Sequence, residues 1–188
     1  MRIIAGIARG TRLHPPRDKS IRPTTDRVKE ALLNSLEPLV DQVVVDLFAG
    51  SGALGLEALS RGAGAVYFID NERRARQLVE RNLKTISPAF EEPPDAHIVP
   101  CDALRTPQFL AGLQPDIVIA DAPYFAEPNR CPLVGLLADA DFAKWLGNGL
   151  LVLERSKHNP LLVPDSWRRL REKSFGDTRL IYLRRQAE

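Results

Sequence analysis

The sequence contains little of what marks a membrane-bound, secreted or metal-binding protein. None of its apolar runs approaches the roughly 20 residues that a membrane-spanning helix requires. The first ten residues, MRIIAGIARG, lack the long apolar segment of a signal peptide. The two cysteines, Cys101 and Cys131, stand in unrelated contexts without the spacing of metal ligands. We therefore expect a cytoplasmic protein with reduced thiols, no metal and no membrane partner.

A strong net charge is also missing, but the charge that is present is unevenly distributed. The net charge is +2, and residues 1–30 contain eight basic and three acidic side chains, which leaves −3 for the rest of the chain. This asymmetry favours a polyanionic partner for the N-terminal segment, although a solvated basic surface explains the charge equally well. The candidate phosphate contacts are Arg9, Arg12, Arg17, Lys19, Arg22 and Arg27.

The length and composition are those of one α/β domain. The 188 residues, 44% apolar and 27% charged, can build a single core. Strand-like apolar runs alternate with helical patterns from residue 43 to about 153, which predicts a parallel sheet with helices on both faces. Residues 167–175 and 179–183 predict an antiparallel hairpin at one edge. We expect a basic N-terminal hairpin and loop over residues 1–24 and the main domain over residues 25–188.

Two of the predicted helices have features that a structure can test. The helix that begins after Thr24 or Thr25 is predicted to turn Val28 and Leu32 inward, with Lys29 on or near its outer side. A second helix is predicted to run unbroken over residues 133–145.

The stretch VVVDLFAGSGALG, residues 43–55, is the strongest functional signal in the chain. A β-branched run leads into an acid, then a glycine loop, then a helical pattern. Gly50 and Gly52 permit a tight turn and leave no side chain between the backbone and a ligand. The first amides of the following helix would point at that ligand. This strand, loop and helix predict a nucleotide-cofactor site.

Acidic residues follow four of the predicted parallel strands. Because ligands bind at the carboxyl ends of such strands, the four acids together favour a binding site over four unrelated caps. Asp70 suits the ribose hydroxyls, and Asp102 suits the exocyclic amine of an adenine. The expected cofactor-binding residues are Asp46, Phe48, Ala49, Gly50, Ser51, Gly52, Asp70, Asn71, Asp102 and Ala103.

The glycine loop also matches the G-x-G-x-x-G pattern of nicotinamide dehydrogenases. Asp46, however, places a carboxyl group where a pyrophosphate would have to lie, so it suits a cationic ligand better. S-adenosyl-L-methionine carries an ammonium and a sulfonium group. We therefore expect this cofactor, with S-adenosyl-L-homocysteine as its product.

The fourth acid begins a tetrapeptide that can hold a planar amine. The Asp121 carboxylate and the Ala122 carbonyl can accept two N–H bonds of an exocyclic amine, while Tyr124 stacks on the ring. The nitrogen lone pair would then point at the methyl donor. The expected catalytic residues are Asp121, Ala122, Pro123 and Tyr124. A turn that merely ends the strand is the simpler alternative.

Four motifs resemble the bacterial 16S ribosomal RNA (guanine-966 N2) methyltransferase family over nearly the whole chain. They are RIIAG..RG..L at 2–13, RPTTDRVKEAL at 22–32, DLFAGSGALGLEALSRGA at 46–63 and the D-x-P-Y site at 121–124. The resemblance implies a Rossmann-like fold with a seven-stranded, mostly parallel sheet. It also implies S-adenosylmethionine as methyl donor and 16S rRNA in a partly or nearly assembled small ribosomal subunit as substrate. We expect a monomer.

One position departs from the family pattern, because Ala122 replaces the first proline of the usual D-P-P-Y or D-P-P-F site. Every residue has a backbone carbonyl, so the acceptor survives, but the fixed φ of proline is lost. Two alternatives follow. The tetrapeptide alone also suits adenine N6 or another nucleic-acid amine, and a degenerate site would leave a protein that binds cofactor or RNA without catalysis.

Overall fold

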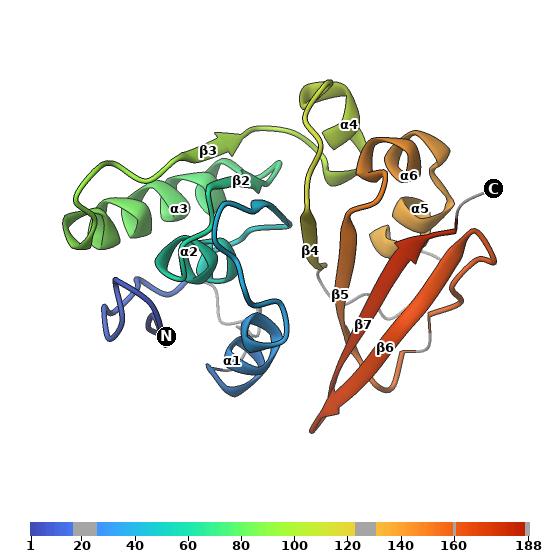
Figure 1. The fold of residues 1–188 in the computed structure, drawn as a ribbon, viewed down its shortest axis with the longest axis horizontal. Helices are drawn as coiled ribbons and strands as arrows, with labels where there is room; N and C mark the ends of the chain where they lie inside the picture. Colours follow the sequence, from blue (N-terminus) through green and yellow to red (C-terminus); the bar gives the residue numbers. More distant parts are fainter. Residues whose placement is uncertain (17–25, 123–130, 160, 187–188) are drawn as a thin grey trace.

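The structure, a computed structural model, describes residues 1–16, 26–122, 131–159 and 161–186. Seven strands form one sheet in the order β3-β2-β1-β4-β5-β7-β6 (Figure 1). The strands are β1 (Val43–Leu47), β2 (Ala65–Ile69), β3 (Ala96–Val99), β4 (Ile117–Asp121), β5 (Leu150–Ser156), β6 (Trp167–Phe175) and β7 (Thr178–Arg185). The helices are α1 (Asp26–Asn34), α2 (Ala53–Ser60), α3 (Arg73–Ile86), α4 (Thr106–Phe109), α5 (Pro132–Ala138) and α6 (Ala140–Leu146), with short 3-10 turns η1 (Ser87–Ala89) and η2 (Ala103–Arg105).

The sheet is parallel from β3 to β5 and antiparallel where β7 and β6 extend it. This confirms the predicted mostly parallel seven-stranded sheet with an antiparallel C-terminal hairpin. The parallel strands β1 and β4 are nearly continuous apolar runs, because helices cover both of their faces.

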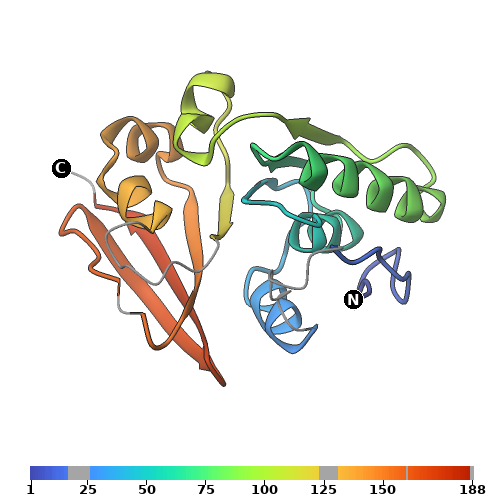
Figure 2. The ribbon, with the colours of Figure 1, turned by 180° about the vertical axis from the view of Figure 1, so that it is seen from behind.

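The two faces of the sheet have separate hydrophobic cores. Alternate strand residues such as Val44 and Ile119 pack with α1, α2 and α3, and we call this side the α1 face. The intervening residues, such as Val45 and Val118, pack with α5 and α6 on the opposite side, the α5 face. Figures 1 and 2 show the two groups of helices from opposite sides. Each strand residue therefore has a known face, which later fixes the surroundings of every functional group.

The prediction of one helix over residues 133–145 was wrong. The chain forms α5 and α6, separated by Asp139 in an extended conformation with φ of −81° and ψ of 112°. The Asp139 carboxylate accepts the backbone N–H groups of Asp141 and Phe142 at 2.8 and 3.1 Å. Such an N-cap stabilises the start of a new helix, so the apolar periodicity continues across a break in the backbone.

The described residues 1–16 of the N-terminal segment form a small hairpin with one β-bridge, between Arg2 and Arg12. The Ile3 N–H donates to the Thr11 carbonyl at 3.0 Å, and the Gly10 N–H donates to the Ile3 carbonyl at 2.9 Å. Ile3, Ala8 and Leu13 are buried in the same core as α1 and α2. The described part of this segment therefore packs as an integral layer of the domain.

Candidate active site

The glycine loop leaves β1 at the carboxyl edge of the sheet and turns directly into α2. Gly50 and Gly52 have φ of +55° and +76°, in the left-handed region that favours glycine. A Cβ at Gly52 would lie 3.2 Å from a methyl carbon of Val79 on α3, so a side chain there would also crowd α3. Phe48 has φ of +58°, which is unusual for a bulky residue and places backbone strain in the same loop. This bend brings the start of α2 over the end of β1.

Asp46 lies on β1 beneath this loop and is 2% exposed. Its Oδ2 accepts the Gly55 N–H at 3.0 Å, which connects the strand to the first turn of α2. Burial above all raises the pKa of Asp46 to about 8, and the carboxylates of Asp121 and Asp70 act in the same direction. The carboxyl group is therefore largely protonated near neutral pH unless a positive charge lies beside it. The negative charge expected at this position depends on the ligand.

Asp70 follows β2 and fixes the glycine loop from the neighbouring strand. Its Oδ2 accepts the Gly50 N–H at 2.9 Å, and its Oδ1 accepts the Glu72 N–H at 2.8 Å. Each carboxylate oxygen has a further lone pair, so both can also accept a hydroxyl group. Asn71 is exposed beside it. This geometry suits the two hydroxyl groups of a ribose.

Asp102 stands in the loop after β3 and is exposed. Its Oδ1 accepts the Leu104 N–H at 2.9 Å and so begins the turn η2. The second carboxylate oxygen, Oδ2, is the one that suits an exocyclic amine. Ala103 is 4% exposed and packs beneath this turn on the α5 face.

Asp121 ends β4 on the strand next to β1, and Ala122 follows it at 5% exposure. The β4–β5 register places Asp121 directly opposite Glu154, which is 4% exposed. Sequence reasoning missed Glu154, although an acid near the end of an apolar strand run was the available signal. Pro123 and Tyr124, the other two residues of the predicted amine receptor, lie outside the described residues.

Three carboxyl groups therefore belong to the α1 face at the carboxyl ends of neighbouring strands: Asp46 on β1, Asp121 on β4 and Glu154 on β5. In the described part of the chain, no cluster of three or more His, Cys, Asp or Glu residues is arranged to hold a metal ion. These carboxyl groups suit cationic and N–H-donating ligands better than a pyrophosphate.

The basic residues predicted to contact RNA fall into two groups. Arg9, Arg12 and Arg27 are exposed on the N-terminal segment and α1. The other three, Arg17, Lys19 and Arg22, lie outside the described residues. The prediction that Lys29 faces outward was wrong, because its side chain is 1% exposed.

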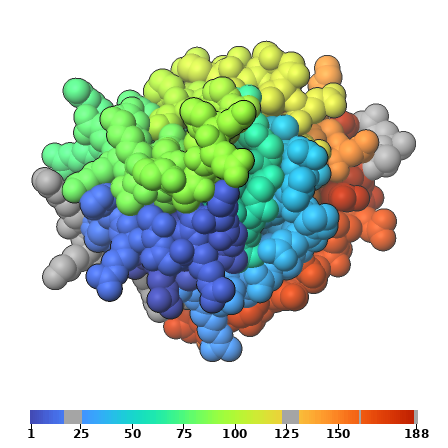
Figure 3. Space-filling model, turned by 60° about the vertical axis from the view of Figure 1, so that its left-hand side comes forward, coloured from blue at the N-terminus to red at the C-terminus, as the bar shows by residue number. Residues whose placement is uncertain are grey.

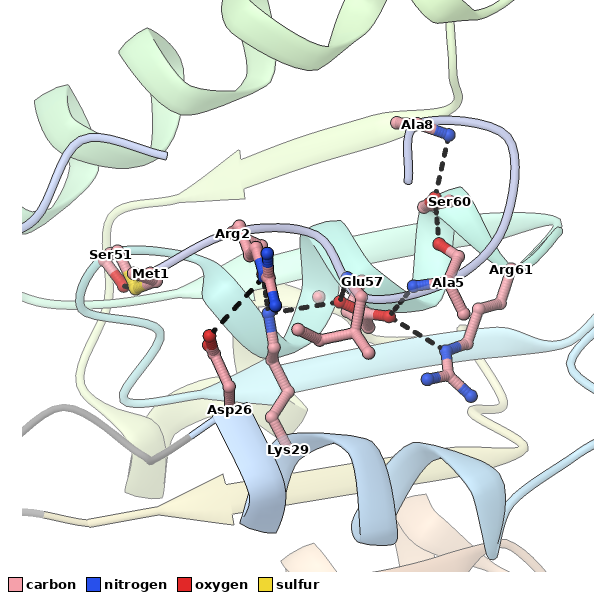
Figure 4. Close-up of polar contacts among 12 residues, drawn as sticks. Met1, Arg2, Ala5, Ala8, Asp26, Lys29, Ser51, Glu57, Ser60 and Arg61 are labelled. Carbon is pink, nitrogen blue, oxygen red and sulfur yellow. Dashed lines mark hydrogen bonds and ion pairs between the residues drawn. The ribbon is translucent and has the colours of Figure 1, made fainter. Parts of the chain in front are cut away.

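Lys29 is buried because Glu57 of α2 accepts several donors at once (Figure 4). The Glu57 carboxylate lies 3.1 Å from Lys29 Nζ and 3.1 Å from Arg61 Nε. It also accepts the backbone N–H groups of Ile4 and Ala5 at 2.8 Å each. Lys29 also donates to the Arg2 carbonyl. One buried glutamate thus joins α1, α2 and the N-terminal segment. Periodicity could not reveal this, since it shows which residues face inward only when they are apolar.

Asn82 of α3 makes a second connection between the N-terminal segment and the glycine loop. Its Nδ2 donates to the Ser51 carbonyl at 2.9 Å and to the His14 carbonyl at 3.1 Å, while its Oδ1 accepts the His14 N–H at 2.7 Å. The Ser51 hydroxyl also donates to the sulfur of Met1 at 3.5 Å. The loop that is predicted to hold the cofactor is therefore braced by the segment that is predicted to meet RNA.

The strand order, the glycine loop after β1 and the acids at the strand ends define a Rossmann-like protein with the fold of S-adenosylmethionine-dependent methyltransferases. The residues present fit that cofactor, because the carboxyl groups match its positive charges and Asp70 matches its ribose.

Comparison with known proteins identifies the particular family. A family described as Conserved hypothetical protein 95 matches residues 1–184. The Escherichia coli protein named Ribosomal RNA small subunit methyltransferase D is 38% identical over 193 residues, covering 100% of this chain and 91% of the relative. Its Haemophilus influenzae namesake is 37% identical over 179 residues, covering 94% and 89%. The chain belongs to the family of ribosomal RNA small subunit methyltransferase D, as its motifs predicted.

Solved structures share this fold. One from Escherichia coli, described as a candidate methyltransferase, has a TM-score of 0.75 at 35% identity and covers 100% of this chain and 99% of that chain. Another, described as a candidate methyltransferase complexed with SAH, shares the fold at 17% identity and a TM-score of 0.68, covering 87% of this chain and 50% of that chain. No helix among the described residues is long and apolar enough to cross a bilayer.

Proposed function

We propose that this chain transfers a methyl group from S-adenosylmethionine to the exocyclic N2 amine of one guanine in the RNA of the small ribosomal subunit. The observation that carries the proposal is the position of Asp121 at the end of β4, next to the β1 strand that bears Asp46 and the glycine loop. Holding two reactants side by side can lower a barrier by about 7–11 kcal/mol in well-oriented systems. The relatives named as small-subunit rRNA methyltransferases support RNA as the substrate.

The cofactor supplies an electrophilic methyl group when bound, and this chain supplies its binding groups. The backbone of Gly50 to Gly52 allows close approach, and Asp70 accepts the ribose hydroxyls while it holds the loop. Asp102 accepts the adenine amine through the carboxylate oxygen that does not cap η2. Asp46 becomes anionic beside the cationic ligand, which offsets the burial that otherwise keeps it protonated. Phe48, Ala49, Ser51, Asn71 and Ala103 complete the proposed cofactor site.

On the substrate side, the Asp121 carboxylate and the Ala122 carbonyl accept the two N–H bonds of the guanine amine, and Tyr124 stacks on the base. Glu154, opposite Asp121 on β5, adds a second carboxyl group to this end of the sheet. A guanine in an RNA loop can be splayed into such a site at lower cost than one in a duplex. Asp121 need not be a strong base, because the product ammonium is acidic and can release its proton to water.

The proposed partner is 16S rRNA within a nearly assembled small subunit, bound by a monomer in the cytoplasm. The exposed Arg9, Arg12 and Arg27 of the described segment would contact phosphate groups and position the RNA without reading its sequence.

The decisive experiment is mass spectrometry of small-subunit RNA from cells that lack this protein. We expect one guanine to lose one methyl group, and the wild-type gene to restore it while an Asp121→Ala variant does not. Loss of a methyl group from adenine N6 would redirect the proposal to that amine. Unchanged methylation would refute the proposed activity and leave a protein that only binds cofactor or RNA.

A further inference from the structure

We infer that the α1-facing side of the β6–β7 hairpin is a second RNA-binding surface, which holds phosphate groups along the edge strand that leads to the proposed amine receptor. This inference rests on the proposed RNA substrate. Residues 167–185 contain seven basic and two acidic side chains, so they have the same net charge of +5 as residues 1–30. The rest of the chain is left with a net charge of −8. The second basic region lies at the opposite end of the sequence from the first.

The strand register divides the charges of this hairpin between its two faces. Arg171 lies opposite Tyr182, and Lys173 lies opposite Leu180, whose side chains belong to the core on the α1 face. Arg168 lies opposite Arg184, two positions beyond Tyr182, so this pair belongs to the same face. We call these four residues the basic hairpin face: Arg168, Arg171, Lys173 and Arg184. No acidic residue of β6 or β7 lies on this face.

The other face of the hairpin is different, because Glu172 lies there. Its carboxylate oxygens lie 2.8 Å from Arg169 Nη1 and 3.1 Å from Arg179 Nη1, so these two arginines have an internal counter-ion. None of the four residues of the basic hairpin face forms an ion pair with a carboxylate of the described part of the chain. All four are exposed. A carboxylate of the chain therefore neutralises arginines on one face of the hairpin but not on the basic hairpin face.

Two features of the basic hairpin face indicate an external anion. Arg168 and Arg184 are direct cross-strand partners, and like charges in that position destabilise a sheet unless something neutralises them. Arg171 is held in one place, with its guanidinium carbon 4.2 Å from the centre of the Tyr182 ring and its Nη2 3.4 Å from the Ser35 carbonyl oxygen. A polyanion would relieve the repulsion and would meet at least one cation that is already positioned.

The register also sets the distance from this face to the proposed amine receptor. Asp121 lies opposite Glu154, Glu154 opposite Leu180, and Leu180 opposite Lys173. Three strand spacings of about 4.8 Å place Lys173 about 14 Å from Asp121 on the same face of the sheet. Arg171 and Arg168 continue along β6, the edge strand, with Leu170 bulged out between Arg169 and Arg171. Arg168 therefore lies nearest the opposite, amino edge of the sheet, and an RNA backbone along β6 would lead from there to Lys173, the basic residue of this face nearest the receptor.

The two basic regions are positioned to share one RNA. Tyr182 of β7 bonds to Ser35, just after α1, at 2.6 Å, so the hairpin packs directly beside α1. In Figure 3 the N-terminal segment, α1 and parts of the C-terminal hairpin are exposed on one side of the molecule. RNA phosphates are the ligand that suits two cationic surfaces in one domain that also bears the proposed amine site.

The test compares two triple variants that each remove two arginines and one lysine. The first is Arg168→Gln/Lys173→Gln/Arg184→Gln on the basic hairpin face. The matched control is Arg74→Gln/Arg81→Gln/Lys84→Gln on the exposed side of α3. Binding to small-subunit ribosomal RNA is measured across a range of salt concentrations, with binding of S-adenosylmethionine and thermal unfolding as checks. Removal of three phosphate contacts should reduce the slope of log Kd against log salt by about 2–3.

For the hairpin variant we expect that reduced slope, an RNA KM raised by about tenfold or more, and a melting temperature no lower than wild type. The α3 control should keep the wild-type slope. Equal slopes and equal KM values for the two variants would overturn the inference, as would a wild-type chain that does not bind RNA. If wild type binds RNA with the expected slope difference but methylates no guanine, the inference stands and the proposed function fails. If wild type methylates guanine but the two variants have the same slope and the same KM, the proposed function stands and the inference fails.

Discussion

The two faces of the sheet are built from the same strands but differ in the polar groups that they contain. On the α1 face, buried or half-buried carboxyl groups stand at the ends of β1, β4 and β5, and a buried ion-pair cluster around Glu57 joins the covering layers. On the α5 face, the described core is mostly apolar, and the buried Arg155 donates to the sulfur of Cys131 at 3.0 Å and to the Asn159 carbonyl oxygen at 2.6 Å. The polar groups of the proposed site therefore gather mainly on the α1 face, whereas the described core of the α5 face is mostly apolar.

This difference shows why polar groups can accumulate on one side without loss of the fold. Glu57 and Asn82 are both fully buried, yet each is satisfied by several partners at 2.7–3.1 Å. Satisfied buried networks specify one arrangement of the layers, whereas a single unpaired member is costly. Because the same network holds the glycine loop and the N-terminal segment, stability and ligand binding should be coupled on this face only.

The largest effect is expected for Glu57→Ala. It leaves Lys29 and Arg61 without their shared carboxylate and two backbone N–H groups without an acceptor, so the free energy of unfolding should fall by about 3–5 kcal/mol. Urea unfolding measures this loss. The double variant Lys29→Met/Glu57→Leu should lose less, since no buried lysine then lacks a partner. A single variant that loses less than about 1 kcal/mol would show that the cluster is not a buried network.

Leu136→Ala is the counterpart on the α5 face. Leu136 is fully buried on α5, and its truncation should cost about 2–5 kcal/mol in the same assay. Calorimetric titration with S-adenosylmethionine then separates the two faces. Glu57→Ala should weaken binding because α2 begins at the glycine loop, whereas Leu136→Ala should leave the Kd within about twofold. Equal changes in the Kd for S-adenosylmethionine in the two variants would show that ligand binding does not depend on the α1 face alone.

Asp121→Asn should lower the rate of methyl transfer by about 100-fold, because misplacing the amine by even about 1 Å has an effect of that size. Asp116→Asn is the matched control at the other end of β4, where the carboxylate is exposed and accepts the Val43 N–H at 2.8 Å. An asparagine can keep that bond, so the control should transfer methyl groups at the wild-type rate. Similar rates for both variants would remove Asp121 from the proposed amine receptor.

The smallest effect concerns the pH dependence that Asp46 confers. Its pKa is raised from 3.8 to about 8 in the folded chain, so the folded state binds more protons than the unfolded state between those values. The contribution of Asp46 is therefore fully present at low pH and is lost as the pH rises through about 8. Relative to Asp46→Asn, wild type should lose about 2 kcal/mol of unfolding free energy between pH 6 and pH 8. Urea unfolding measures both proteins. A difference in unfolding free energy between wild type and Asp46→Asn that stays constant from pH 6 to pH 8 would contradict the raised pKa.

Much of the fold was predictable because its signals are local. The strand at 43–47, the glycines that follow and the hairpin over residues 167–183 were each predicted from a few neighbouring residues, and the strands formed there. Asp139 was missed because its carboxylate caps α6 without interrupting the apolar period. Lys29 was misplaced because a lysine reads as an exposed residue unless its partner, Glu57, is known.

The site was predictable in part for the same reason. Acids after parallel strands could be gathered at one edge from the chain alone, since parallel strands end at the same edge. Which face each acid belongs to, and that Glu154 lies opposite Asp121, depends on the pairing of β4 with β5. The contrast between the two faces of the β6–β7 hairpin likewise depends on register, because a shift of one residue would exchange them.

By itself, the sequence determined most of the succession of strands and helices along the chain, the glycine loop and most of the chemical groups at the strand ends. These follow from backbone preferences and apolar periodicity within short stretches of chain. Only the tertiary structure decided that Asp46 is buried enough to resist ionisation, that Glu57 unites three layers and that four cations share one face of the hairpin. Burial, ion pairing and strand register arise between residues far apart in the sequence, so no local pattern contains them.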